Sequence, residues 1–68
     1  MTLFAIRLKN LRDENNITQI ELASAIGVNQ SAIALWERGK SEPTASNIKA
    51  AAEFFDVSAD YLLGLVDY

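Results

Sequence analysis

The chain is 68 residues long, half of its residues are hydrophobic, and it contains no cysteine and no histidine. This length predicts a single domain over residues 1–68, and the absent residue types exclude disulfides, Cys/His metal sites and catalysis that needs His or Cys. Six basic residues against nine acidic ones argue against generic binding to nucleic acid, because such binding depends on neutralising phosphates.

The first predicted helix covers residues 3–14. Phe4, Leu8 and Leu11 recur there at the spacing of one face of an amphipathic helix. The pair Asn15-Asn16 that follows is typical of a turn. No apolar stretch in the chain approaches the roughly 20 residues that span a bilayer, so we expect no contact with a membrane and a protein of the cytoplasm.

Capping residues set the limits of the second and third predicted helices. Thr18 and Glu21 form a capping box that begins the second helix. Gly27 ends it, because glycine tolerates the left-handed conformation that closes a helix. Asn29 then caps the third helix, which we expect to extend to residue 36 or 37.

The fourth predicted helix begins after Thr44 and ends near Asp56, a residue type that tolerates the left-handed conformation. Ser58 caps a short fifth helix over residues 59–63, and Gly64 closes it. The chain shows no strand pattern. Because short connections join short helices, the sequence predicts an all-α fold, a compact bundle of five helices.

Residues 19–38 contain the motif around which the other helices are arranged. Two short helices meet there at a tight turn on Gly27, which permits a positive φ. The apolar positions of their shared seam are Leu22, Ala23, Ile26, Val28, Ile33 and Trp36. Ala23 has to be small because the two helices cross closely at that point. This pattern is typical of a helix-turn-helix, whose second helix can enter the major groove of DNA.

A set of short motifs accompanies this seam. They are Thr18-Gln19, Leu22-Ala23, Gly27-Val28, Gln30-Ser31, Ile33, Trp36-Glu37-Arg38-Gly39-Lys40, Pro43, Ser58 and Asp60-Tyr61-Leu62-Leu63-Gly64. With them, residues 8–64 resemble the Cro/phage-repressor helix-turn-helix family, and the run from Trp36 to Lys40 is the most specific part of the resemblance. The family likeness implies a five-helix bundle that binds operator DNA, usually as a symmetric dimer.

The resemblance also implies which residues read DNA. Gln19 matches a position that contacts a backbone phosphate, in agreement with the free N–H groups at a helix N-terminus. Asn29, Gln30 and Ser31 match the base-reading end of the third helix, although we expect Asn29 to act mainly as the cap. Gln30 is the first candidate for direct readout, because a glutamine can pair bidentately with adenine.

The loop after the third helix matches a phosphate-contacting segment of the family, which implies DNA contacts for Arg38, Lys40 and Ser41. Two outward positions of the third helix depart from the family pattern, because Ala34 and Leu35 are apolar where base-reading side chains are common. Leu35 can contact a thymine methyl group or a protein partner.

Two further groups of residues have structural roles in this interpretation. Arg12 and Glu37 match a buried salt bridge of the family that orients the recognition helix. Surplus apolar residues near the C-terminus predict a dimer surface, with packing of the tail onto the core as the alternative. The residues of this surface are Tyr61, Leu62, Leu65, Val66 and Tyr68.

The sequence therefore predicts a transcriptional regulator, a repressor that binds a palindromic operator as a homodimer with its third helix in the major groove. The alternative is a protein-interaction module on the same fold, such as an antitoxin, an anti-repressor or the N-terminal part of a larger regulator. The excess of acidic residues in the chain and the apolar Ala34 and Leu35 favour that alternative. We expect no enzyme and no cofactor, because the chain has no glycine-rich phosphate loop and no metal-ligand cluster.

Overall fold

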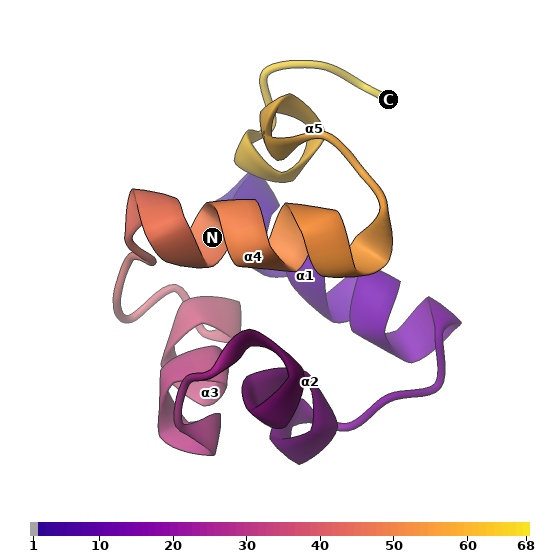
Figure 1. Cartoon of the computed structure of the whole chain (residues 1–68). Coiled ribbons are helices and arrows are strands. Elements are labelled where there is room, and N and C mark those ends of the chain that lie inside the picture. The colour runs from indigo at the N-terminus through magenta and orange to yellow at the C-terminus, as the bar shows by residue number, and fades with distance from the viewer. Residues whose placement is uncertain (1) are drawn as a thin grey trace.

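The computed structural model describes residues 2–68. Its helices are α1 (Leu3–Glu14), α2 (Gln19–Ile26), α3 (Gln30–Glu37), α4 (Ala45–Phe55) and α5 (Ala59–Leu63). No strand occurs among the described residues. In Figure 1, α4 crosses in front of α1, α5 lies above them, and α2 and α3 lie below. The predicted all-α bundle of five helices is confirmed.

Local capping chemistry begins and ends α2, α4 and α5 where the sequence predicts. The Thr18 hydroxyl accepts a hydrogen bond from the backbone N–H of Glu21 at 3.1 Å, and the Glu21 carboxylate accepts one from the N–H of Thr18 at 2.9 Å. This capping box satisfies two N–H groups that the first turn of α2 leaves free. At the opposite ends of helices, Gly27 with φ of +74° and Asp56 with φ of +56° take the left-handed conformation.

The core lies where the helices cross: α1 packs on α3 and α5, and α2 packs on α3 and α4. The apolar side chains of Leu8, Leu22, Ile33 and Leu62 are completely buried in it. Each contributes about 1.5–3 kcal/mol by its removal from water. Because these residues come from four different helices, the core joins the helix-turn-helix to the rest of the bundle.

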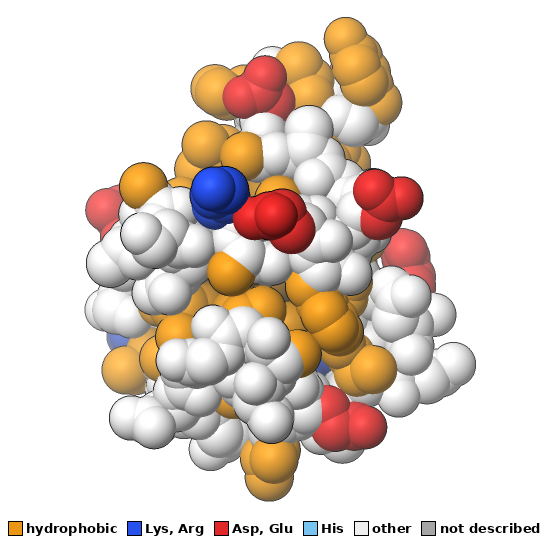
Figure 2. Space-filling model, viewed as in Figure 1, with side chains coloured by type: hydrophobic (Ala, Val, Ile, Leu, Met, Phe, Trp, Pro, Cys, Tyr) orange, Lys and Arg blue, Asp and Glu red, His pale blue; other side chains and the backbone are white. Residues whose placement is uncertain are grey.

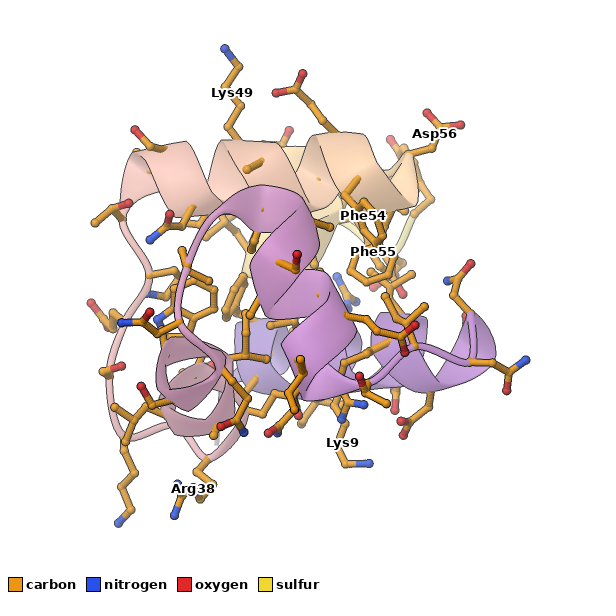
Figure 3. The ribbon with its side chains drawn as sticks, turned by 60° about the horizontal axis from the view of Figure 1, so that its bottom comes forward. Lys9, Arg38, Lys49, Phe54, Phe55 and Asp56 are labelled. Carbon is orange, nitrogen blue, oxygen red and sulfur yellow. The ribbon has the colours of Figure 1, made fainter. Side chains whose placement is uncertain are left out.

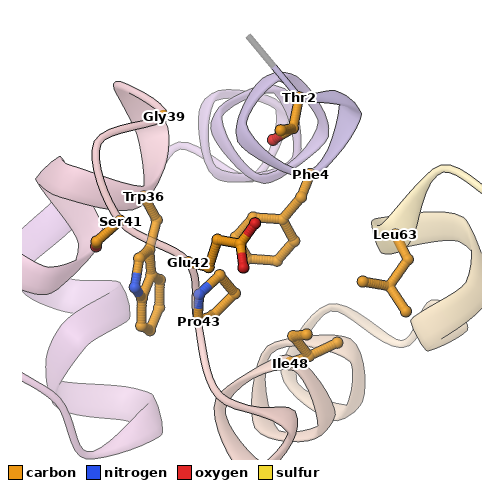
Figure 4. Close-up of a pocket in the computed structure, with 9 residues that line it drawn as sticks. All are labelled: Thr2, Phe4, Trp36, Gly39, Ser41, Glu42, Pro43, Ile48 and Leu63. Atoms are coloured by element: carbon orange, nitrogen blue, oxygen red, sulfur yellow. The ribbon is translucent and has the colours of Figure 1, made fainter.

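Trp36, at the end of α3, connects this core to the surface. Its ring stands edge-on to that of Phe4, with 6.2 Å between the ring centroids. Both rings line a pocket of about 290 Å³ beside the α3–α4 loop, and Figure 4 shows them with Glu42 and Pro43 of that loop, which also line it. The pocket is at the lower limit of the sizes that enclose small-molecule ligands, roughly 300–1,000 Å³.

The C-terminal segment is attached to α1 through Arg7. The Arg7 guanidinium donates hydrogen bonds to the backbone carbonyls of Tyr61 and Val66, the second at 2.7 Å. It also lies 4.3 Å from the centre of the Tyr61 ring, and its Nη2 is 3.7 Å from the Asp67 carboxylate. Arg7 therefore holds α5 through the Tyr61 carbonyl, and it holds the segment after α5 through the Val66 carbonyl and the Asp67 carboxylate.

This packing corrects one part of the predicted dimer surface. Leu62 has no exposed surface, so its assignment to that surface is wrong. It is a core residue because α5 turns this position toward α1 and α4. Tyr61 and Val66 are half-buried, whereas Leu65 is 71% and Tyr68 is 88% exposed.

Among the described residues, no helix has both the length and the apolar character needed to cross a membrane.

Candidate nucleic-acid interface

The turn between α2 and α3 places the N-termini of both helices at one surface. Ala23 is 3% exposed and lies in the core cluster with Leu22 and Ile33. The N–H of Val28 donates to the carbonyl of Ala23 at 3.0 Å, which closes the turn over Gly27. A larger side chain at residue 23 should push the two helices apart, because extra volume in a close-packed core forces shifts of the backbone.

A buried ion pair joins α1 to the end of α3. Arg12 donates from Nε to Oε2 of Glu37 at 2.9 Å and from Nη2 to Oε1 of Glu37 at 3.0 Å. The two side chains are 12% and 5% exposed. Arg12 also donates from Nη1 to the carbonyl of Ile17 at 3.0 Å. The hydrogen bond to Glu37 raises the pKa of Arg12, so the guanidinium keeps its charge in spite of its burial.

Gln19, the first residue of α2, extends this ion pair into a chain of hydrogen bonds. Its Nε2 donates to Oε1 of Glu37 at 3.0 Å. Its Oε1 accepts from Nε2 of Gln30, the first residue of α3, at 2.6 Å. The two glutamines are therefore held together at the surface by a carboxylate and a guanidinium beneath them.

The start of α3 exposes Asn29, Gln30 and Ser31 together. Asn29 has the extended backbone of a cap residue, but its side chain makes no capping hydrogen bond. The expectation that capping would be the main role of this side chain is therefore wrong. Apolar side chains stand nearby at the surface, because Leu35 is 39% exposed and Ile20, next to Gln19, is 69% exposed.

Basic groups lie in the loop that follows α3. Arg38, Lys40 and Ser41 are all exposed. The Nε of Arg38 donates to the carbonyl of Ala34 at 3.3 Å, which leaves the rest of the guanidinium available. In Figure 3, Arg38 and Lys9 point to the same side of the molecule and Lys49 points to the opposite side, beyond α4.

Acidic groups dominate other parts of the surface. The face shown in Figure 2, formed mainly by α4 and α2, carries several acidic side chains and little basic charge. The Nζ of Lys9 lies 2.7 Å from the Asp13 carboxylate, which partly neutralises its charge. The hydrogen bond from Lys9 lowers the pKa of the Asp13 carboxyl. The net charge of −3 is thus unevenly distributed around the bundle.

The structure places the predicted site residues in two groups. Gln19 and Gln30 are in direct contact, and Asn29 and Ser31 flank Gln30 in the chain. Leu35 and the loop residues Arg38, Lys40 and Ser41 follow along α3 and past its end.

Sequence reasoning did not predict the bonds that link Gln19 to Glu37 and to Gln30. These residues are 18 and 11 positions apart, and no helical spacing indicates such contacts. It also did not predict that Ile20, next to Gln19, would be 69% exposed.

Comparison with known proteins agrees with this geometry. A family model described as Helix-turn-helix matches residues 8–62. The chain is 40% identical over 60 residues to the HTH-type transcriptional activator BcrR of Enterococcus faecalis, a match that covers 88% of this chain and 29% of that protein. It is 36% identical over 61 residues to Repressor protein C2 of Salmonella phage P22, covering 90% of this chain and 28% of the repressor.

Solved structures show the same arrangement of helices. The P22 c2 repressor protein in complex with the synthetic operator 9T superposes with a TM-score of 0.86 at 35% identity, covering 93% of this chain and 96% of that one. The restriction-modification controller protein C.AhdI from Aeromonas hydrophila superposes with a TM-score of 0.83 at 30% identity, covering 90% and 92%. The chain belongs to the Cro/phage-repressor helix-turn-helix family.

Proposed function

We propose that this chain binds operator DNA in a sequence-specific manner and acts in transcription regulation as a repressor. One observation carries the proposal: two glutamines at the N-termini of α2 and α3, the half-buried Gln19 and the exposed Gln30, lie side by side and are held by a buried ion pair. A base-reading surface needs polar groups in a fixed position, and helix N-termini suit the adjacent phosphates. The operator complex of the P22 c2 repressor supports this use of the fold.

In this proposal α3 enters the major groove. Gln30 and Ser31 face base edges, with Leu35 against a thymine methyl group. Asn29 is available for a phosphate because its side chain is not used in capping. The backbone N–H of Gln19 lies at the N-terminus of α2, where a phosphate is favoured by the helix dipole.

The loop after α3 supplies the positive charge of the interface through Arg38 and Lys40, with Ser41 beside them as a neutral phosphate ligand. Because so few cations are available there, we expect the binding constant to fall only gradually with salt. The slope of its logarithm against the logarithm of the salt concentration is about −0.9 for each neutralised phosphate. From this DNA-binding role we infer that the protein works in the cytoplasm and that it acts by binding and not by catalysis.

We also propose that the chain acts as a homodimer on two half-sites about 34 Å apart. The surface we assign to the dimer contains the exposed Leu65 and Tyr68, with Tyr61 and Val66 at its edge. Leu63, 45% exposed, adds apolar area to it. Such a cluster of apolar side chains at the surface is typical of an interaction site.

A protein-interaction module is the second candidate, and the acidic charge of −3 favours it. Salt titration separates the two functions. Binding to random duplex DNA that weakens with salt supports the DNA-binding proposal, and no measurable binding to duplex DNA at low salt supports the interaction module.

The main test is selection of bound sites from a random duplex pool, which reports binding, specificity and half-site spacing together. We expect a palindrome with half-sites one helical turn apart. Gln30→Ala should cost about 1–3 kcal/mol on the selected site and should relax the preference at one base pair. Binding of this variant to random DNA should stay unchanged. An equal loss on selected and random DNA would remove Gln30 from the base-reading role.

A further inference from the structure

We propose that the pocket beside Trp36, at the end of α3 away from Gln30, binds a small aromatic amine in its cationic form. The pocket has a volume of about 290 Å³, and its lining comes from the start of α1, the α3–α4 loop, α4 and α5. Binding of an amine there is independent of the proposed binding to DNA, and it can be measured without DNA.

The inner wall of this pocket is apolar and rigid. Phe4 and Trp36 are only 7% and 4% exposed, and their rings stand edge-on to each other. Because close-packed core side chains keep fixed positions, this wall is formed before a ligand arrives. Ile48 and Leu63 add aliphatic side chains, and Pro43 adds a ring from the loop. Such a wall favours an aromatic ligand, since aromatic rings pack well edge-on or offset against one another.

The size of the pocket limits the ligand to one ring with a short arm. A cavity of roughly 150 Å³ lined by aliphatic and aromatic side chains can hold benzene. The pocket beside Trp36, at about 290 Å³, therefore has room for a benzene ring and an arm of two or three atoms. Figure 4 shows the aromatic and aliphatic side chains that would surround the ring.

The polar part of the pocket is acidic. Within residues 2–68, Glu42 is the one charged residue that lines it, and none of the ion pairs of this part of the chain includes Glu42. Because Glu42 is exposed and the two rings are buried, the pocket is charged toward solvent and apolar toward the core. Ser41, also exposed, adds a hydroxyl group to the lining.

This arrangement selects the charge of the ligand. An ammonium group has three N–H donors and no acceptor, and a carboxylate and a hydroxyl oxygen can both accept from it. The ring of an aromatic amine would lie against Phe4 and Trp36, with its ammonium group at Glu42. A neutral alcohol of the same shape keeps the apolar contacts and loses the ion pair. A ligand with a carboxylate is repelled by Glu42, and no cation of the lining compensates for this.

The main experiment titrates the full chain with phenethylamine, phenethyl alcohol and hydrocinnamate, which have the same ring and a cationic, neutral or anionic group. Trp36 is the one tryptophan of the chain and lines the pocket, so its fluorescence reports binding. We expect a Kd on the order of 1 mM for the amine, since the ligand has few atoms. The alcohol should bind about two- to fivefold more weakly, the fold-change of one exposed ion pair. Hydrocinnamate, and ethylamine without a ring, should give no saturable signal.

The variant Glu42→Gln removes the charge and keeps the shape of the side chain. Its affinity for phenethylamine should fall about two- to fivefold, to that of the alcohol, and its affinity for the alcohol should stay unchanged. Glu14→Gln is the matched control, because it removes the same charge from an exposed residue at the other end of α1, outside the pocket. An equal loss in the two variants would indicate general attraction to an acidic protein and would overturn the inference.

A heteronuclear NMR titration with phenethylamine tests the position of the site. The backbone N–H signals of Gly39 and Ser41, which line the pocket, should shift with the Kd measured by fluorescence. Those of Val57 and Ala59, which line a separate groove between α4 and α5, should stay in place. The reverse pattern, or an alcohol that binds as tightly as the amine, would also overturn the inference. Since DNA is absent, each of these outcomes is separate from the success or failure of the proposed DNA binding.

Discussion

Replacing Arg12 with methionine should remove about 3 kcal/mol from the free energy of unfolding. The change strands the Glu37 carboxylate, whose side chain is 5% exposed, and breaking a buried ion pair in this way costs about 3–5 kcal/mol. The lower end applies here because Gln19 continues to donate to Glu37 and because the Arg12 side chain is itself 12% exposed.

This loss is large for a small domain. Typical stabilities of roughly 0.05–0.15 kcal/mol per residue correspond to about 3–10 kcal/mol for this chain. A shift of about 4–8 °C in Tm per kcal/mol predicts a Tm lower by about 12–24 °C. Denaturation by urea, followed by circular dichroism, measures the free energy of unfolding directly.

A double-mutant cycle makes the reasoning refutable. Glu37→Met leaves Arg12 with only the Asp13 carboxylate, 3.6 Å away, and should also destabilise the chain. The double variant Arg12→Met with Glu37→Met should recover most of the loss, because an apolar pair of similar volume often replaces a buried ion pair at little cost. Single losses below about 1 kcal/mol, or a double variant whose loss equals the sum of the two single losses, would show that the pair is not coupled in the way the structure indicates.

Three further predictions follow from single positions. Leu62→Ala should lower the free energy of unfolding, measured by urea denaturation, by about 2–5 kcal/mol, because it opens a cavity in the core. Leu65→Ala should lower it by less than about 0.5 kcal/mol. Equal losses for the two variants would contradict the burial of Leu62. Gly64→Ala should lower the free energy of unfolding more than Gly27→Ala does. Both positions have positive φ, which costs about 1–2 kcal/mol of strain for alanine, but of the two only Gly64 has a side chain in the way of a new Cβ, that of Leu3 at 2.7 Å. A lower Tm for Gly27→Ala than for Gly64→Ala would refute this. Lys40→Ala should lower the salt slope of DNA binding by about 1 with the base preferences unchanged, and a slope identical to that of the wild type would exclude Lys40 as a phosphate contact.

The helix limits could be predicted from the sequence because capping is local chemistry. Thr18 and Glu21 are three residues apart, and their hydrogen bonds depend only on the first turn of α2. Gly27 and Asp56 close helices by a backbone conformation that each residue type tolerates. The spacing of Leu22 and Ile33 around the turn likewise predicts the shared seam, since it follows from helix geometry.

The tertiary structure decided which neighbours the functional side chains have. α5 is five residues long, too short for periodicity to distinguish Leu62, which is buried, from Leu63, which is exposed. The contact between Gln19 and Gln30 joins two helices, and it continues through Glu37 at the far end of α3 to Arg12 on α1. Hydrogen bonds of this kind depend on how the helices cross. The sequence by itself determined the scaffold, and only the packed bundle determined the orientation of the groups that we expect to read DNA.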